Sequence, residues 1–278
     1  MPQELEDILT VKNRCVAWTC SLILFLGFLP LLSHAHPCKS SGNPMFSLIN
    51  RPSYMDSPCT IPSSQLMVEG GYQYRNLVGQ PRADASLFPS IELRFGLPKA
   101  TEFFVYLPAV AASSRNTNNG TTETSLGLKH EVFFTESFIT SFTAHLYPPS
   151  GSYYVGAQSP GTEVGIIMED IITNTLSATA MLSVLYEGQS KSQENTQYTS
   201  FNPDVVISLA LNPFVMFFTE VYGQSKVSPV LGSGFNINGG LIFLVAQNAT
   251  FDIEASHRLS GYLNGFNAYV GVGGAIKL

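Results

Sequence analysis

From Gln65 to Leu278 the chain repeatedly alternates apolar and polar residues with a period of two. Segment 91–97 alternates large apolar residues with Glu92 and Arg94, and segment 251–256 alternates apolar residues with acidic and hydroxyl side chains. A period of two is typical of β-strands that present one apolar and one polar face, and no helical periodicity competes with it. The pattern therefore predicts an all-β domain.

About twelve such runs, each rich in Val, Ile, Leu, Phe, Tyr and Thr, predict twelve strands. We place them near residues 65–75, 87–97, 101–112, 124–134, 137–147, 163–172, 175–187, 203–211, 214–224, 233–246, 249–258 and 266–278.

The connections between these strands alternate between short and long. The short ones are Pro98-Lys99-Ala100, Thr135-Glu136, Thr173-Asn174, Asn212-Pro213 and Gln247-Asn248. The long ones, rich in Asn, Ser, Gly and Thr, are 76–86, 113–123, 148–162, 188–202, 225–232 and 259–265. In an up-and-down meander, successive connections emerge at opposite ends, so short turns gather at one end and long loops at the other. This sorting is typical of bacterial outer-membrane barrels.

The predicted fold is thus a transmembrane antiparallel up-and-down β-barrel of about 12 strands over residues 65–278, in the bacterial outer membrane. A soluble carrier barrel with the opposite facing is the alternative, but it leaves the sorted loops unexplained. Charged side chains are costly toward lipid, so the polar faces should line the lumen. The expected lumen-lining residues are Glu69, Arg75, Glu92, Arg94, Lys129, Glu131, His145, Glu169, Glu220, Asp252, Glu254 and Lys277.

The N-terminal residues carry a different signal. Lys12 and Arg14 precede an apolar run that ends in Ser33-His34-Ala35, which predicts a secretory signal peptide over 1–35. An uncleaved membrane anchor is the alternative, since the run is close to the length that spans a bilayer. Residues 36–64 have no period and form an expected irregular periplasmic extension.

Cys38 and Cys59 are the two cysteines that follow the predicted cleavage site. In an exported chain they predict a disulfide that closes a loop of about 20 residues and staples the extension. Metal binding is the alternative, but no His or third Cys lies between them. Because the stapled loop joins directly to the first strand, the extension could also fold back into the lumen.

Composition narrows the function. The chain is 45% hydrophobic and 12% charged, with a formal net charge of −6 and no cluster of basic residues. This composition excludes a disordered chain and a nucleic-acid-binding protein. No phosphate-binding loop, metal-ligand cluster or dinucleotide motif stands out, and we predict no catalytic residues and no cofactor.

Three motifs resemble the outer-membrane family described as putative MetA-pathway of phenol degradation. They are Ile91-Glu92-Leu93-Arg94-Phe95-Gly96-Leu97, Ser125-Leu126-Gly127-Leu128-Lys129-His130, and Phe251-Asp252-Ile253-Glu254-Ala255 followed by Tyr269-Val270-Gly271-Val272-Gly273-Gly274. The resemblance covers most of 65–278. It implies a transporter-like barrel that passes small, hydrophobic or aromatic compounds, without catalytic residues.

The leading functional hypothesis is a channel for passive passage of small solutes, with membrane lipids, a small-molecule solute and the outer-membrane assembly machinery as partners. A structural or surface-adhesin barrel with a plugged lumen is the alternative, because neighbouring charges such as Glu92 and Arg94 could neutralise one another. A phospholipase-like enzyme is a remote alternative, with His130, His145 and His257 as candidate bases.

Overall fold

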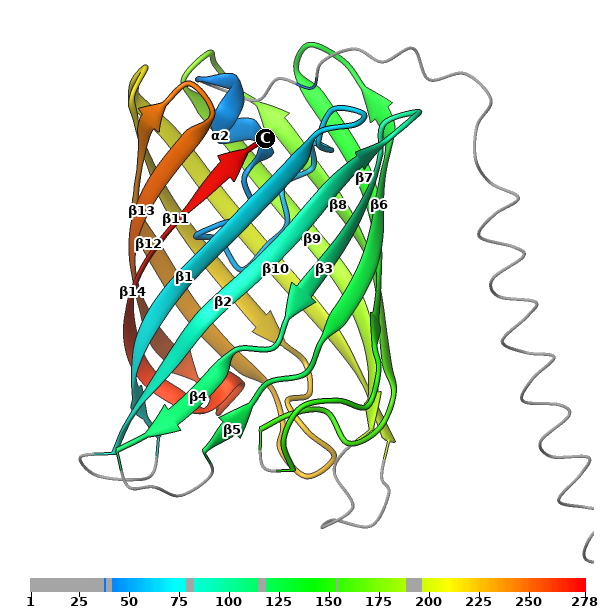
Figure 1. The fold of residues 1–278 in the computed structure, drawn as a ribbon, viewed down its shortest axis with the longest axis vertical. Helices are drawn as coiled ribbons and strands as arrows, with labels where there is room; N and C mark the ends of the chain where they lie inside the picture. The colour runs from blue at the N-terminus through cyan, green and yellow to red at the C-terminus, as the bar shows by residue number, and fades with distance from the viewer. Residues whose placement is uncertain (1–37, 39–41, 79–82, 115–118, 154, 189–196) are drawn as a thin grey trace, which may run out of the picture. The chain divides into compact units, whose positions relative to one another are not determined.

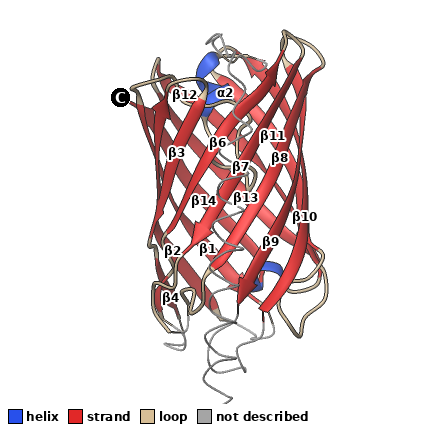
Figure 2. Cartoon of the chain, turned by 90° about the vertical axis from the view of Figure 1, so that its right-hand side faces the viewer, coloured by secondary structure: helices blue, strands red, loops and turns tan. Residues whose placement is uncertain are grey.

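The computed structural model describes residues 38, 42–78, 83–114, 119–153, 155–188 and 197–278, and within them the strands close into a barrel (Figures 1 and 2). Its elements are α2 (Pro44–Leu48), β1 (Leu66–Leu77), β2 (Asp84–Leu97), β3 (Thr101–Leu107), β4 (Val110–Ser113), β5 (Gly120–Thr121), β6 (Ser125–Phe134), β7 (Phe138–Tyr147), β8 (Gly161–Ile171), β9 (Leu176–Gly188), β10 (Gln197–Asn212), β11 (Val215–Gln224), β12 (Gly234–Ala246), β13 (Ala249–Ser260), the 3-10 turn η1 (Leu263–Gly265) and β14 (Phe266–Lys277).

Two of the barrel strands are interrupted. β3 and β4 both pair with β2 and lie end to end, separated at Pro108 and Ala109. β5 and β6 continue one another in the same way, because β5 pairs with β4 and β6 pairs with β3. Proline cannot donate a hydrogen bond to a sheet ladder, which accounts for the break at Pro108. The fourteen segments therefore make twelve barrel strands, as the sequence predicts.

Pairing is antiparallel throughout and follows the order of the chain, and β1 closes the barrel by pairing with both β2 and β14. Glu69 of β1 lies opposite Glu92 of β2 and opposite Ala275 of β14. The prediction of an all-β, up-and-down barrel is confirmed. The short turns, α2 and the C-terminus lie at one end of the barrel (Figure 1); we call this the turn end, and the other the loop end.

Several strands are longer than the sequence indicates. β10 begins at Gln197, not at 203, and β2 begins at Asp84, not at 87. The prediction was wrong for β10 because the polar stretch 188–202 was assigned to a loop, whereas its last six residues belong to the strand. Pro203 is accommodated inside β10 because it pairs only with Leu182 of β9, and the ladder to β11 begins one residue later, at Asp204.

The two faces of the barrel have opposite character. Large apolar side chains such as Phe142, Val205, Phe217 and Val272 are exposed on the outside. Polar and charged side chains point inward on the same strands. This facing is the one expected for a barrel surrounded by lipid, and it is the reverse of a soluble carrier barrel. No helix of the described residues is long and apolar enough to cross a membrane.

The predicted signal peptide, 1–35, lies outside the described residues. The extension that follows it does not stand apart from the barrel, because residues 43–61 enter the lumen from the turn end. We call this segment the plug. Of the two positions considered for the extension, the described part takes the one in which it folds back into the lumen, where it packs inside the barrel wall.

Candidate functional site: a plugged lumen

The plug is held first by an apolar cluster at the turn end. Asn43 caps α2 by accepting a hydrogen bond from the backbone N–H of Met45 at 2.9 Å. This short helix and the following residues bury apolar side chains against inward-facing residues of the wall. The cluster comprises Met45, Phe46, Leu48, Ile49, Met55, Cys59 and Ile61 of the plug with Met67, Ile139, Ile167, Val206, Met216, Phe218, Ile242 and Ala275 of the strands.

Inward carboxylates form the second set of contacts, because they accept hydrogen bonds from backbone N–H groups of the plug. Glu69 accepts from Asn50 at 3.1 Å and from Arg51 at 2.8 Å. Glu131 accepts from Thr60 at 2.6 Å. The irregular backbone of the plug has no ladder of its own, so these carboxylates satisfy donors that would otherwise be buried without a partner.

Two further carboxylates complete this pattern around the lumen. Glu102 of β3 accepts from the backbone N–H of Ile61 at 2.8 Å. Glu220 of β11, a strand that is not adjacent to β3 in the sheet, accepts hydrogen bonds from the backbone N–H groups of Tyr54 and Met55 at 2.8 and 3.0 Å. The plug is therefore attached to the wall at several points along its length, through charge-assisted hydrogen bonds that are stronger than neutral ones.

A buried charge network lies beneath the plug. The guanidinium of Arg94 binds both oxygens of Glu102, at 2.8 and 3.0 Å, and Glu69 at 2.7 Å, and it also donates to the backbone oxygen of Leu48. Lys129 lies 3.3 Å from Glu102. All of these side chains are almost completely buried. The charges of the wall thus balance one another and hold the plug at the same time.

Arg51 of the plug forms a second ion-pair cluster, with β13, on the part of the wall that continues from β1 through β14. Its guanidinium lies 3.2 Å from Asp252 and 3.5 Å from Glu254. The guanidinium occupies the space above Gly71 and Gly273, where a Cβ atom would come within 2.5 Å of it. Glycine at these two wall positions therefore lets the plug approach the sheet closely.

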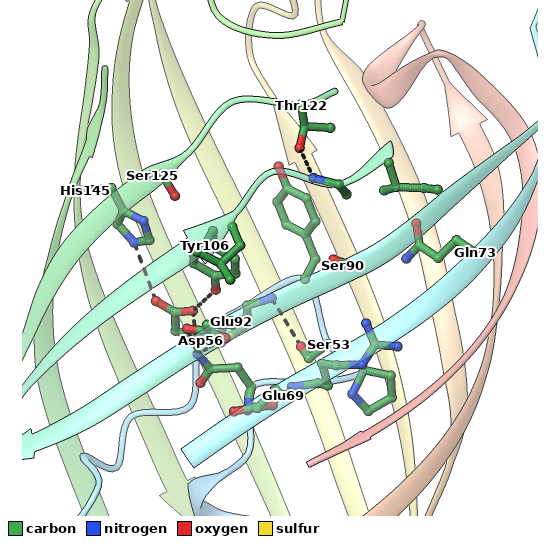
Figure 3. A pocket seen from close by; sticks show the side chains of 18 of the residues that line it. Ser53, Asp56, Glu69, Gln73, Ser90, Glu92, Tyr106, Thr122, Ser125 and His145 are labelled. Atoms are coloured by element: carbon green, nitrogen blue, oxygen red, sulfur yellow. Dashed lines mark hydrogen bonds and ion pairs between the residues drawn. The ribbon is translucent and has the colours of Figure 1, made fainter. Parts of the chain in front are cut away.

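Asp56 of the plug contacts His145, with 3.5 Å between Nε2 and Oδ2, and accepts hydrogen bonds from Asn50 and Tyr106 (Figure 3). Burial acts to raise the pKa of this carboxyl, but its hydrogen bond to His145 and the positive charges nearby lower the pKa to about 2. Asp56 is therefore an anion at neutral pH, held against the wall by His145 and Tyr106.

A chamber of about 370 Å³ lies on the loop side of the plug (Figure 3). Plug residues 50–56 form its floor, and its walls come from β1–β3, β6–β9, β13 and β14. Tyrosine rings and carboxylates dominate the lining. They include Tyr54, Tyr106, Tyr147 and Tyr269, and Glu69, Glu92, Glu123, Glu163 and Glu254.

A much smaller cavity, of about 60 Å³, lies between the plug and the wall of β8–β12. It is lined by plug residues 46–58 and by apolar wall residues such as Met216 and Phe218. A cavity of this size has room for only a few water molecules. The plug therefore narrows the lumen strongly near the turn end.

The structure places the twelve expected lumen-lining residues as follows. Glu69, Glu92, Arg94, Lys129, Glu131, Glu169, Glu220, Asp252 and Glu254 are buried on the inner face. His145 also points inward, whereas Arg75 and Lys277 are half-buried near the two ends of the barrel. Arg75 donates to Gln73 at 2.6 Å and lies over the ring of Phe266. The remaining candidate bases lie elsewhere, since His130 contacts Thr101 and His257 is exposed on β13.

Other important residues were missed by sequence reasoning. Glu102 shares the inward face with Phe104 and Tyr106, so its apolar neighbours hid it. Arg51 and Asp56 lie in an aperiodic segment, where alternation gives no facing. The expected pairing of Cys38 with Cys59 is present, with 5.6 Å between the Cα atoms. Among the described residues, no group of three or more His, Cys, Asp or Glu side chains is arranged to hold a metal ion.

A family model, described as putative MetA-pathway of phenol degradation, matches residues 49–272. The chain belongs to this family. The match begins inside the plug, so the family's pattern includes part of the lumen segment as well as the strands. No curated protein matches the chain in sequence.

Solved structures with a similar barrel fold include two porins. The NanC porin superposes with a TM-score of 0.53 at 13% identity, covering 77% of this chain and 100% of the porin. The KdgM porin, whose structure was also determined in complex with disordered oligogalacturonate, superposes with a TM-score of 0.53 at 9% identity, covering 76% of this chain and 98% of the porin. These superpositions show that the family member described here shares the barrel fold of the porins.

Proposed function

We propose that this protein is a passive outer-membrane channel for small solutes, and that its plug restricts passage. The observation that carries the proposal is the chamber of about 370 Å³ inside the lumen, floored by the plug and lined by polar groups. A barrel with a purely structural role would gain most stability from a lumen filled by side chains, as in the smallest barrels. This lumen keeps a solute-sized space on its loop side.

The lining favours particular solutes. Four tyrosine rings offer flat apolar surfaces with hydroxyl groups at their edges, which suits small aromatic compounds that carry hydroxyl groups. Carboxylates outnumber cationic groups around the chamber, so neutral or cationic solutes should enter more readily than anions. An acidic oligosaccharide, such as the one bound by the KdgM porin, is a poor match for this charge.

The plug determines how solutes would leave the chamber. Because the cavity beside the plug holds only a few waters, a solute larger than water does not pass through this cavity unless the plug shifts. Glu131 and Glu220, which would set the field of an open pore, instead hold the plug here. The role of Glu131 and Glu220 in selectivity is therefore indirect. Glu163, in contrast, contacts Tyr147 and Ser183 of the wall and faces the chamber directly.

Swelling of proteoliposomes tests this function. Vesicles containing purified protein are diluted into neutral, cationic and anionic solutes of similar size, including a small phenolic alcohol. We expect the rates for neutral and cationic solutes to exceed the anionic rate, and the difference to shrink in Glu163→Gln. A variant that lacks residues 43–61 is measured in parallel, provided that it still forms a heat-modifiable barrel. If neither this variant nor the native protein gives swelling with any solute, the structural or adhesin role is favoured.

A further inference from the structure

Glu163 of β8 faces the chamber without the cationic partner that other chamber carboxylates have. Glu69 binds Arg94, and Glu254 lies 3.5 Å from Arg51. Within the described part of the chain, no Lys, Arg or His side chain forms an ion pair with Glu163, which is half-buried and lines the chamber. Its negative charge is therefore available to a cation that enters from the loop end.

The hydrogen bonds that Glu163 accepts come from neutral groups. The hydroxyl of Tyr147 donates at 2.8 Å, the amide of Asn202 donates at 3.1 Å, and the hydroxyl of Ser183 also donates. His145 lies opposite Glu163 in the pairing of β7 with β8, but its ring nitrogen contacts the carboxylate of the plug. The neutral donors orient the Glu163 carboxylate and leave its charge unbalanced.

An acceptor without a donor lies beside Glu163. Asn202 of β10 is 5% exposed, and its Oδ1 has no hydrogen-bond partner among the described residues. The two side chains are joined directly, because the amide nitrogen of Asn202 donates to Glu163. Buried oxygens are normally paired. This part of the wall therefore has both a spare acceptor and an unbalanced negative charge, which a ligand with a positive charge and several N–H groups would satisfy.

An aromatic ring of the plug faces the same chamber. Tyr54 is 46% exposed to the space of the lumen, although one face of its ring stacks on Tyr222 with 4.4 Å between the ring centroids. Burial inside the barrel raises the pKa of the Tyr54 hydroxyl, and among the charged groups Glu163 adds most to this rise. The Tyr54 side chain and the Glu163 carboxylate are therefore close enough to interact, and both line one chamber.

We propose that the chamber binds small aromatic primary amines, with the ammonium group on Glu163 and the aromatic ring against Tyr54. This inference rests on the proposed channel function and names its solute. A primary ammonium carries three N–H donors, and its hydrogen bonds to a carboxylate are charge-assisted and strong. An aromatic ring gains further from stacking on Tyr54. The chamber volume of about 370 Å³ lies within the range of ligand pockets, about 300–1,000 Å³.

Isothermal titration calorimetry tests this inference on protein purified from outer membranes in detergent. Three probes share one phenol ring and one chain length: tyramine ends in an ammonium, tyrosol in a hydroxyl and 4-hydroxyphenylacetate in a carboxylate. We expect tyramine to bind about tenfold more tightly than tyrosol, because a charged hydrogen bond replaces a neutral one, and the acid to bind least. N-acetyltyramine keeps the ring and loses the charge, and it should bind as weakly as tyrosol.

Two variants assign the ammonium and the ring to their partners. Glu163→Gln keeps a hydrogen-bond acceptor but removes the charge, so it should weaken tyramine binding about tenfold and leave tyrosol binding unchanged. Tyr54→Leu should weaken the binding of both. Glu187→Gln is the matched control, because Glu187 accepts a hydrogen bond from Tyr198 as Glu163 does from Tyr147, but does not line the chamber. It should bind tyramine like the native protein.

Equal affinity of the native protein for tyramine, tyrosol and N-acetyltyramine would overturn the inference, and this comparison needs no variant to fold. Equal loss of tyramine binding in the Glu163 and Glu187 variants would also overturn it. The outcome is separable from that of the channel function. Swelling with neutral solutes but no preference for tyramine would reject the amine site alone, whereas tight tyramine binding without any swelling would support the site and reject passage.

Discussion

Glu220 and Tyr54 are 166 residues apart in sequence, yet the Glu220 carboxylate accepts the backbone N–H of Tyr54 at 2.8 Å. The same carboxylate also binds the hydroxyl of Ser53 at 2.6 Å. This relationship joins the middle of the plug to the middle of a barrel strand. It implies that the acidic residues of the lumen hold the plug, and that removing one carboxylate should loosen the plug locally.

The Arg94 network should be essential for stability. Arg94→Met leaves Glu69 and Glu102 buried without their strongest partner, and breaking one side of a buried ion pair costs about 3–5 kcal/mol. We therefore expect a large fall in the urea concentration at which the barrel unfolds. Loss of heat-modifiable migration on gels measures this unfolding. Arg75→Gln is the control, since half-buried Arg75 binds only Gln73 and Phe266 among the contacts described. Equal stability of the two variants would contradict the assignment.

The disulfide should stabilise the plug without being required for the barrel. Cys38→Ser opens a loop of about 20 residues, which corresponds to roughly 3 kcal/mol in the chain-entropy model. The strands contain no cysteine, so this variant should still insert into the outer membrane. Thiol labelling of denatured, unreduced native protein should leave Cys38 and Cys59 unmodified. Labelling of both residues in native protein would rule out the pairing.

The outer face should tolerate apolar but not charged residues. Val272 of β14 is 44% exposed on the outside of the barrel. Val272→Arg places a cation toward lipid at a cost of about 2–4 kcal/mol near the bilayer midplane, whereas Val272→Leu should be neutral. Quantifying folded protein in isolated outer membranes compares the two. Equal levels of both variants would indicate that this face does not contact lipid.

The loop end should face the outside of the cell. Epitope tags inserted between β7 and β8 or between β9 and β10, at the non-strand residues of 148–162 and 188–202, should bind antibody on intact cells, because these connections emerge at the end opposite the C-terminus. Detection of these tags only after permeabilisation of the outer membrane would reverse the topology. A tag at the short turn Gln247-Asn248 is the control, and it should require permeabilisation.

The barrel could be predicted from sequence because the alternation of apolar and polar residues shows which side chains share a face of each strand. Once Glu92 and Arg94 alternate with large apolar residues, the cost of charge in lipid assigns them to the lumen, and the sorted loops identify the membrane architecture. For the plug, the sequence analysis offers entry into the lumen only as one alternative, and it does not predict the contacts that hold the plug. Its position depends on contacts between Asn50 and Glu69, and between Arg51 and Asp252, which no local periodicity encodes.

Glu102 and Asp204 illustrate a second reason. Glu102 shares its face with Phe104 and Tyr106, and Asp204 lies at the very start of the predicted strand 203–211. In both cases the local pattern was ambiguous, and only the register of the closed sheet assigns the side chain to the lumen. Sequence alternation is therefore informative where the inner face is uniformly polar, and it is weaker where apolar plug contacts make that face mixed.

Conductance across planar lipid bilayers tests the central claim, that a plug held by lumen carboxylates restricts the channel. Recordings compare native protein with Glu220→Gln and Glu131→Gln, each of which replaces a carboxylate that accepts plug N–H groups. The control is Glu187→Gln, because the Glu187 carboxylate accepts a hydrogen bond from Tyr198 of the neighbouring strand. We predict small, infrequent openings for the native protein and the control, and larger or more frequent openings for both plug variants. Identical conductance in all four proteins would contradict the account.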